Sequence, residues 1–251
     1  MPSGEDEAIC IRHWDYSESS QTVGVFTRSA GVVRALARGS RRQGGRHSGG
    51  IDLLTHARAT LTQRPGTDLA NLDVWDLVDG FPMLRRRRRA SQIAFYLAEL
   101  VGRFFQPGDP HPQVFDALVG ALSRLGATNR DAPDSMLLLW FQWVVLKESG
   151  YQPLLGRPAS EDELLHFEPR NGGALVPSPT PTSWRVRRST IDFIARVLCD
   201  EVPEHPVDDL DSLDRSNRLF AAYIREVLGD EPLTMRELFG RLDPRGAQRQ
   251  P

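Results

Sequence analysis

Lysine, cysteine and long apolar runs are all scarce in this sequence. Lys147 is the one lysine among 31 basic residues, so the rest are arginines, a bias that also follows from genome composition. Cys10 and Cys199 are the two cysteines; they lie far apart in apolar runs, which predicts buried thiols and not a disulfide framework. No signal peptide is evident, and no apolar stretch approaches the roughly 20 residues that span a bilayer. The sequence therefore predicts a cytoplasmic protein.

Recognisable catalytic motifs are also missing. There is no Gly-x-Ser-x-Gly elbow, no Gly-rich phosphate loop ending in lysine, and no Cys-x-x-Cys pair. His205 with Asp208 and Asp209 forms the one cluster of metal-ligand type, and a solvated acidic loop explains it better. We therefore expect no catalytic residue, no metal and no cofactor. A binding protein is favoured, with an enzyme whose site is unrecognised as a weaker alternative.

A basic segment between Thr27 and His47 is the most informative feature that is present. It holds six arginines and no acid, although the net charge of the 251-residue chain is only −2. Alternation along a strand puts Val33, Ala35 and Ala37 on one face and Arg34 and Arg38 on the other. A Gly/Ser-rich loop follows. This pattern predicts phosphate-backbone contact by Arg28, Arg34, Arg38, Arg41, Arg42 and Arg46, the alternative being a solvated, charged hairpin loop.

The first third of the chain has the pattern of a small β-barrel. Short β-favouring runs alternate with turn residues, and Ser29-Ala30-Gly31 is short enough for a hairpin turn. The OB-fold is the commonest five-stranded barrel for a segment of this length. The five strands are expected at 8–14, 22–27, 31–38, 51–61 and 69–78.

After Gly80-Phe81-Pro82 the apolar period becomes helical. The first helix should end near residue 105, and others are expected at 112–125, 132–149, 190–199, 214–228 and 234–239. The third is apolar nearly all round, which favours the centre of a bundle, and Gly150 follows as its cap. We therefore predict an α+β protein with an OB-fold nucleic-acid-binding domain at 1–82. An all-helical domain at 83–251 follows, with an irregular insert at about 151–183.

A second basic cluster runs from Arg85 to Arg89, at the start of the first predicted helix. Cations there oppose the positive end of the helix dipole. We expect one or two of them to pair with acids such as Asp76 or Asp79. The others should extend the basic surface of the barrel. We predict a secondary basic patch of Arg85, Arg86, Arg88 and Arg89, for which a solvated charge run is the slightly preferred alternative to DNA contact.

Five motifs in this order resemble those of the bacterial RecO recombination mediators, and the resemblance covers nearly the whole chain. They include Phe26-Thr27 with Gly31 ahead of a strand that ends Gly-Ser-Arg-Arg, and the sequence Gly150-Tyr-Gln-Pro153. All five lie at 8–19, 25–42, 96–100, 150–153 and 234–239. Many members of that family carry four zinc-binding cysteines after Gly-Tyr-x-Pro. This chain has none between Leu154 and Pro177, so we predict no zinc.

The resemblance implies a non-enzymatic, nucleoid-associated DNA repair protein. Such a protein binds single- and double-stranded DNA, promotes annealing and helps to load the strand-exchange recombinase onto coated single strands. The implied partners are RecR and the acidic C-terminal tail of single-stranded-DNA-binding protein. Trp14, Tyr16 and Phe26 are candidate stacking platforms for bases. Each could equally belong to the barrel core, and for Phe26 the core is the preferred interpretation. The rival hypothesis is an OB-like adaptor that binds protein tails without touching DNA.

Overall fold

The computed structural model divides into two compact units, residues 1–124 and 125–251, and each is described by itself below. The structure describes residues 3–41, 51–63, 66–127, 130–156, 162–198 and 208–242. The first unit contains the barrel and also two helices. Among the described residues no helix is both long enough and apolar enough to cross a membrane.

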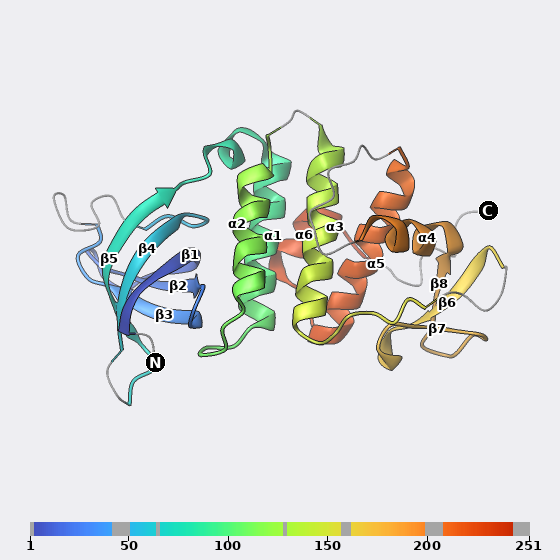
Figure 1. Ribbon diagram of the computed structural model, residues 1–251, viewed down its shortest axis with the longest axis horizontal. Helices are drawn as coiled ribbons and strands as arrows, with labels where there is room; N and C mark the ends of the chain where they lie inside the picture. The colour runs from blue at the N-terminus through green and yellow to red at the C-terminus, as the bar shows by residue number, and fades with distance from the viewer. Residues whose placement is uncertain are drawn as a thin grey trace. The chain divides into compact units, whose positions relative to one another are not determined.

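Five strands of the first unit close into a barrel, as predicted (Figure 1). They are β1 (Ser3–Asp15), β2 (Gln21–Thr27), β3 (Gly31–Ala37), β4 (His56–Thr62) and β5 (Ala70–Asp79), in the order β1-β2-β3-β5-β4. The long β1 pairs with both β2 and β4, and its register shifts between Cys10 and Arg12. A bulge there bends the strand, which lets one strand serve two neighbours around a tightly curved wall.

The barrel interior is filled by small and β-branched side chains, as the alternation in β3 predicts. Val33, Ala35 and Ala37 point inward and Arg34 is exposed. Cys10 is fully buried in the same core, and burial raises the pKa of its thiol to about 12. The fourth strand is shorter than predicted and begins at His56, because Leu54 adopts a left-handed backbone with φ of 59° that ends extended structure.

Two helices and a short 3-10 helix complete the first unit. Helix η1 (Pro82–Arg86) leads into α1 (Arg88–Phe104), and α2 (Pro112–Arg124) follows, close to the predicted limits. Phe26 is fully buried outside the barrel, where its ring stacks on Phe105 at 6.3 Å between centroids and lies 5.8 Å from Phe115. The barrel wall and these helices therefore share an aromatic core.

The Phe-Thr motif with its following glycine has a clear physical basis. The Thr27 hydroxyl donates to the Gly31 carbonyl at 3.0 Å and accepts from the Ala30 N–H at 3.1 Å, which fixes the β2–β3 turn. Gly31 has a φ of +71°, and a Cβ there would lie 2.4 Å from the carbonyl oxygen of Asp109. Only glycine fits this position, where the α1–α2 connection lies against the turn.

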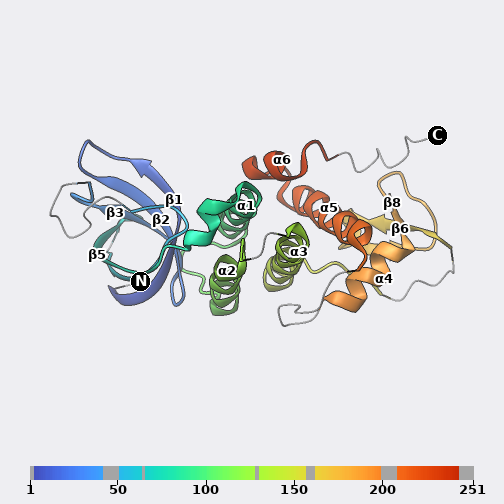
Figure 2. The same cartoon turned by 90° about the horizontal axis from the view of Figure 1, so that it is seen from above.

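In its described residues, the second unit has four α-helices, one short 3-10 helix and a small sheet. Figure 2 shows these helices beside the sheet. The helices are α3 (Asp131–Glu148), α4 (Arg188–Val197), α5 (Leu210–Leu228) and α6 (Leu233–Phe239), and α3 is buried nearly all round, as predicted. The predicted irregular segment at 151–183 contains β6 (Leu164–Glu168), η2 (Pro169–Asn171) and β7 (Ala174–Val176). These strands and β8 (Trp184–Arg187) form the order β7-β6-β8. Strands of three to five residues amid proline and glycine leave too little periodicity to recognise.

Packing and hydrogen bonds hold this small sheet. Phe167 stacks on Trp184 at 5.6 Å and meets Tyr223 edge-on at 5.5 Å. The buried Glu168 carboxylate accepts from the hydroxyls of Thr180 and Thr182 and from the Arg170 N–H. These bonds, led by that from Thr180, lower the pKa of Glu168. Its charged form therefore ties the 169–183 connection to the strand.

The Gly-Tyr-x-Pro motif closes α3. Gly150, with a φ of +80°, donates its N–H to the Lys147 carbonyl, and Tyr151 donates to Leu146 at 2.8 Å. This pair of bonds is the Schellman pattern, which favours glycine at the predicted cap. A Cβ on Gly173 would lie 2.7 Å from Pro153 Cβ, so the end of the motif packs closely on that glycine.

Candidate nucleic-acid interface

The outer face of β1, β2 and β3 carries two lines of mainly large side chains, on either side of Gly24 and Thr22 on β2. Alternation places Arg12, Trp14 and Tyr16 on one line and Arg34, Leu36 and Arg38 on the other. Strand register sets Arg12 opposite Gly24 and Gly24 opposite Arg34, and it sets Trp14 opposite Thr22 and Thr22 opposite Leu36. We call these six residues, Arg12, Trp14, Tyr16, Arg34, Leu36 and Arg38, the basic–aromatic strip.

Trp14 lies at the centre of this strip. A Cβ on Gly24 would lie 3.8 Å from two atoms of the indole, so the absence of a side chain on β2 lets the ring lie across the strand. The Arg34 guanidinium carbon lies 5.6 Å from the indole centroid, within cation–π range. Trp14 nevertheless remains 45% exposed, so part of its ring is available to a ligand.

Three arginines of the strip are exposed and carry no ion pair. Among the residues that the structure describes, no carboxylate lies within salt-bridge distance of Arg12, Arg34 or Arg38. Unpaired cations side by side on one surface are the arrangement that a phosphate backbone neutralises. Arg34 and Arg38 were predicted for this role, and the structure places both, exposed, along β3 and its end.

Two other predicted residues are held by acids. Arg28 donates to both carboxylate oxygens of Asp116 on α2, from Nε at 3.0 Å and from Nη2 at 2.8 Å. That pair raises the pKa of the Arg28 guanidinium. Arg41 forms a short ion pair with Asp15 at the end of β1. Arg28 also lies in the β2–β3 turn, at the opposite end of β3 from Arg38 and Arg41. Arg42 and Arg46 lie outside the described residues.

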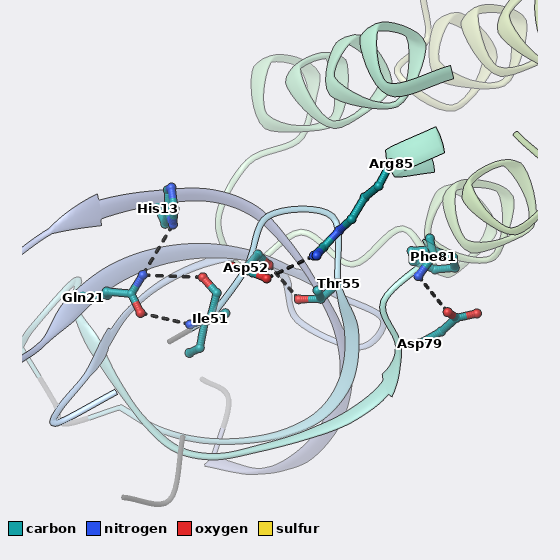
Figure 3. Close-up of polar contacts among 8 residues, drawn as sticks. All are labelled: His13, Gln21, Ile51, Asp52, Thr55, Asp79, Phe81 and Arg85. Carbon is teal, nitrogen blue, oxygen red and sulfur yellow. Dashed lines mark hydrogen bonds and ion pairs between the residues drawn. The ribbon is translucent and has the colours of Figure 1, made fainter. Parts of the chain in front are cut away.

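The ends of the predicted basic loop meet at one buried side chain. Gln21 Oε1 accepts from the Ser40 hydroxyl at 2.9 Å and from the Ile51 N–H at 3.0 Å. Its Nε2 contacts His13 Nδ1 at 3.4 Å and the Ile51 carbonyl at 3.5 Å (Figure 3). Gln21 therefore fixes the points at which the chain leaves β3 and returns toward β4.

The secondary basic patch is split between two helices. Arg87 is extended, with φ of −134°, so η1 ends at Arg86 and α1 begins at Arg88. Arg86 and Arg88 are exposed and Arg89 is half-buried. Arg85 pairs with Asp52 at 3.0 Å, where Asp76 or Asp79 was predicted, and Asp79 instead accepts from the Phe81 N–H at 2.7 Å (Figure 3).

The other side of the barrel is acidic. Glu7 on β1 lies opposite Arg58 on β4, and Arg58 lies opposite Asp76 on β5; Glu5, two residues before Glu7, is exposed as well. Val74 and Val78 on β5 are 42% and 54% exposed on this surface. Exposed carboxylates on this side repel a polyanion, whereas the strip carries exposed arginines.

Nothing in the described part of the chain resembles a metal centre, since no group of three or more metal-ligating side chains gathers there. Asp209 instead accepts from the Ser212 N–H at 2.8 Å and caps α5, while His205 lies outside the described residues. Phe26 is a buried core residue, the interpretation preferred from the sequence, whereas Trp14 and Tyr16 are exposed. Arg12 was overlooked because it follows a short apolar run and lies outside the basic segment; its spacing of two from Trp14 was the available signal.

Comparison with known proteins agrees with this architecture. Residues 1–81 match the family model of the N-terminal part of recombination protein O, and residues 85–235 match that of its C-terminal part. The chain is 33% identical over 179 residues to DNA repair protein RecO of Anaeromyxobacter dehalogenans, covering 69% of each chain. It is 29% identical to that of Rhodopirellula baltica, over 82% of this chain and 78% of the relative. It is 28% identical to that of Burkholderia pseudomallei, over 93% and 82%. The chain therefore belongs to the RecO family, whose curated relatives are named DNA repair proteins.

Proposed function

We propose that this protein is a non-enzymatic recombination mediator that binds single- and double-stranded DNA through the basic–aromatic strip. The observation that carries the proposal is the row of Arg12 and Arg34 across Gly24, with Trp14 between them. Unpaired arginines supply charge for phosphates, and exposed rings supply stacking surfaces for unpaired bases. In the predicted division, residues 1–82 bind DNA and residues 83–251 serve contacts with proteins.

Annealing follows from the same surface. Neutralising phosphates on two complementary strands lowers their mutual repulsion, so a protein that binds each strand along its backbone helps them to meet. From the family resemblance we propose that the protein also helps to load the strand-exchange recombinase onto single strands coated by single-stranded-DNA-binding protein. RecR and the acidic tail of the coating protein are the proposed partners.

The test is the binding of a labelled single-stranded oligonucleotide across a salt series. Wild-type affinity should fall steeply with salt, because cations released from phosphates accompany binding. The Arg12→Ala/Arg34→Ala/Arg38→Ala variant should lower the slope of log affinity against log salt by about 2, at about 0.7 per lost contact. Annealing of complementary strands should slow in parallel.

The matched control removes the same charge elsewhere. Arg58→Ala/Arg185→Ala/Arg236→Ala takes away three exposed arginines outside the strip, and its slope should equal that of the wild type. If both triple variants lower the slope equally, net charge alone determines binding, and the hypothesis that the strip contacts the phosphates is refuted. Absence of binding at low salt would favour the adaptor that binds protein tails, for which the pairing of Arg28, Arg41 and Arg85 with acids is the supporting observation.

A further inference from the structure

One end of the strip is hollowed. Tyr16, Ser19 and Ser20 from the β1–β2 turn face Leu36, Arg38 and Gly39 from the end of β3 across a cavity of about 370 Å³. Pockets for small ligands span about 300–1,000 Å³, so this one suits a compact group. Contact with phosphates requires surface charge but does not require a cavity. We therefore ask what else the hollow could bind.

The apolar surfaces of the hollow suit a flat ring. Tyr16 is 63% exposed although it is aromatic, and Leu36 beneath is only 6% exposed. An exposed tyrosine beside a buried leucine offers one ring for stacking and one aliphatic surface for contact. Every nucleobase has a π-face that such a ring can stack on, whatever its identity.

The polar groups of the hollow suit the edge of a base and its phosphate. The Ser20 Oγ accepts the Gly39 N–H at 3.1 Å, which leaves the hydroxyl proton of Ser20 available to donate. The Ser19 hydroxyl makes no hydrogen bond within the described part of the chain. Base edges carry both donors and acceptors, which hydroxyl groups can match in either sense. Arg38 is exposed at the same site and can meet the adjoining phosphate.

The two walls of the hollow are joined in the free protein. Besides the bond between Gly39 and Ser20, the Arg41 N–H donates to the Ser19 carbonyl at 3.2 Å, and Arg41 pairs with Asp15. The Tyr16 N–H donates to the Ser20 carbonyl at 3.1 Å within the turn. A site whose walls are already fixed loses little conformational entropy when a ligand binds.

We propose that this hollow binds one unstacked nucleobase of a single strand, with the base on Tyr16 and its phosphate on Arg38. The inference rests on the proposed function, because it assigns a base-binding position to the same DNA-binding surface. A base within a duplex must leave its stack to enter such a pocket, at a cost of a few kcal/mol. The hollow therefore favours single strands, frayed ends and mismatches over continuous duplex.

The experiment compares oligothymidylate with an abasic oligonucleotide of equal length and phosphate number. Both probes are titrated against the full-length wild type, Tyr16→Ala, Tyr16→Phe and the control Phe95→Ala, which removes another exposed ring from α1. Wild type should prefer the base-containing probe about fivefold or more, as expected for one stacked base. Tyr16→Ala should reduce this preference about fivefold or more, to what the Trp14 ring alone supplies, and keep the salt slope, while Tyr16→Phe and Phe95→Ala should keep both. Thermal melting of each variant verifies that it is folded.

Each outcome separates the inference from the proposed function. Salt-dependent binding with equal affinity for the two probes, or a preference unchanged in Tyr16→Ala, would overturn the base-binding hollow and leave the phosphate-binding strip intact. Absence of salt-dependent binding to either probe would overturn the proposed function, and the inference with it.

Discussion

The backbone N–H of Ile51 donates a hydrogen bond of 3.0 Å to the side-chain oxygen of Gln21, and both residues are buried. The same oxygen accepts from the Ser40 hydroxyl. One polar side chain at 3% exposure therefore satisfies donors from two segments that lie 11 positions apart in the sequence.

Replacing Gln21 with leucine should lower the free energy of unfolding by about 1–3 kcal/mol, the usual cost of leaving a buried donor unsatisfied. Chemical denaturation measures the difference. Gln152→Leu, at an exposed position, is the matched control and should change stability by less than about 0.5 kcal/mol. Equal effects of the two substitutions would contradict the role assigned to Gln21.

Alanine at Gly31 should destabilise the protein by at least about 1–3 kcal/mol, from the left-handed backbone conformation alone. The clash of the new Cβ with the Asp109 carbonyl, 2.4 Å away, adds to this cost. Gly120→Ala is a control whose expected change in stability has the opposite sign. Gly120 lies within α2 with open space around it, so alanine there should stabilise by about 0.5–1 kcal/mol. Melting temperatures that move in the same direction would refute this account.

Arg28→Ala should leave the salt dependence of DNA binding unchanged, because both carboxylate oxygens of Asp116 already accept from that guanidinium. The variant should instead reduce stability, since α2 loses its ion pair with the β2–β3 turn. Asp116→Ala should reproduce the loss of stability. A shallower salt slope in Arg28→Ala would show that this arginine leaves Asp116 to bind phosphate.

Glu168 should make folding sensitive to acid. Its pKa in the folded state is lowered from the ordinary 4.5, first by the hydrogen bond from Thr180, so its carboxylate stabilises the fold above pH 4.5. That stability is lost as the pH falls below 4.5 through the lower folded-state pKa. Glu168→Gln should be less stable than wild type at neutral pH, and the difference should shrink in acid. Urea denaturation across this range measures it.

Glu163→Gln is the control for that series. Glu163 is exposed and lies just before β6, so its substitution should leave the acid limb of the stability curve unchanged. A constant difference between Glu168→Gln and wild type at all pH values would mean that the lost stability is not linked to ionisation.

Local pattern was enough to predict much of the fold. Alternation around Val33 and Ala35 identified the inward face of β3, and Gly150 marked the end of α3, because both features depend on near neighbours in sequence. The three-stranded sheet β7-β6-β8 was missed since its strands are too short to show a period. Its stability depends on contacts such as that of Phe167 with Tyr223, far along the chain.

The candidate site was less predictable because the state of an arginine depends on distant partners. Arg28 and Arg34 look alike in the sequence, yet Arg28 meets an acid 88 residues away and Arg34 meets a tryptophan. Arg12 shows the reverse case, a residue without basic neighbours that the register of β1 and β2 places in the strip. The number of arginines in the sequence pointed to β3, and the pairing of strands shows which side chains share its outer face.

The parallel pairing of β3 with β5 is the shortest strand pairing in the barrel. It pairs at Ala35–Ala70 and Leu36–Asn71, whereas every other neighbouring pair of strands matches at seven positions. The barrel should open first at this short pairing, while the other four strand pairings stay intact. Amide hydrogens along this pairing should therefore exchange with solvent sooner than those between β1 and β2, and they report partial opening before global unfolding.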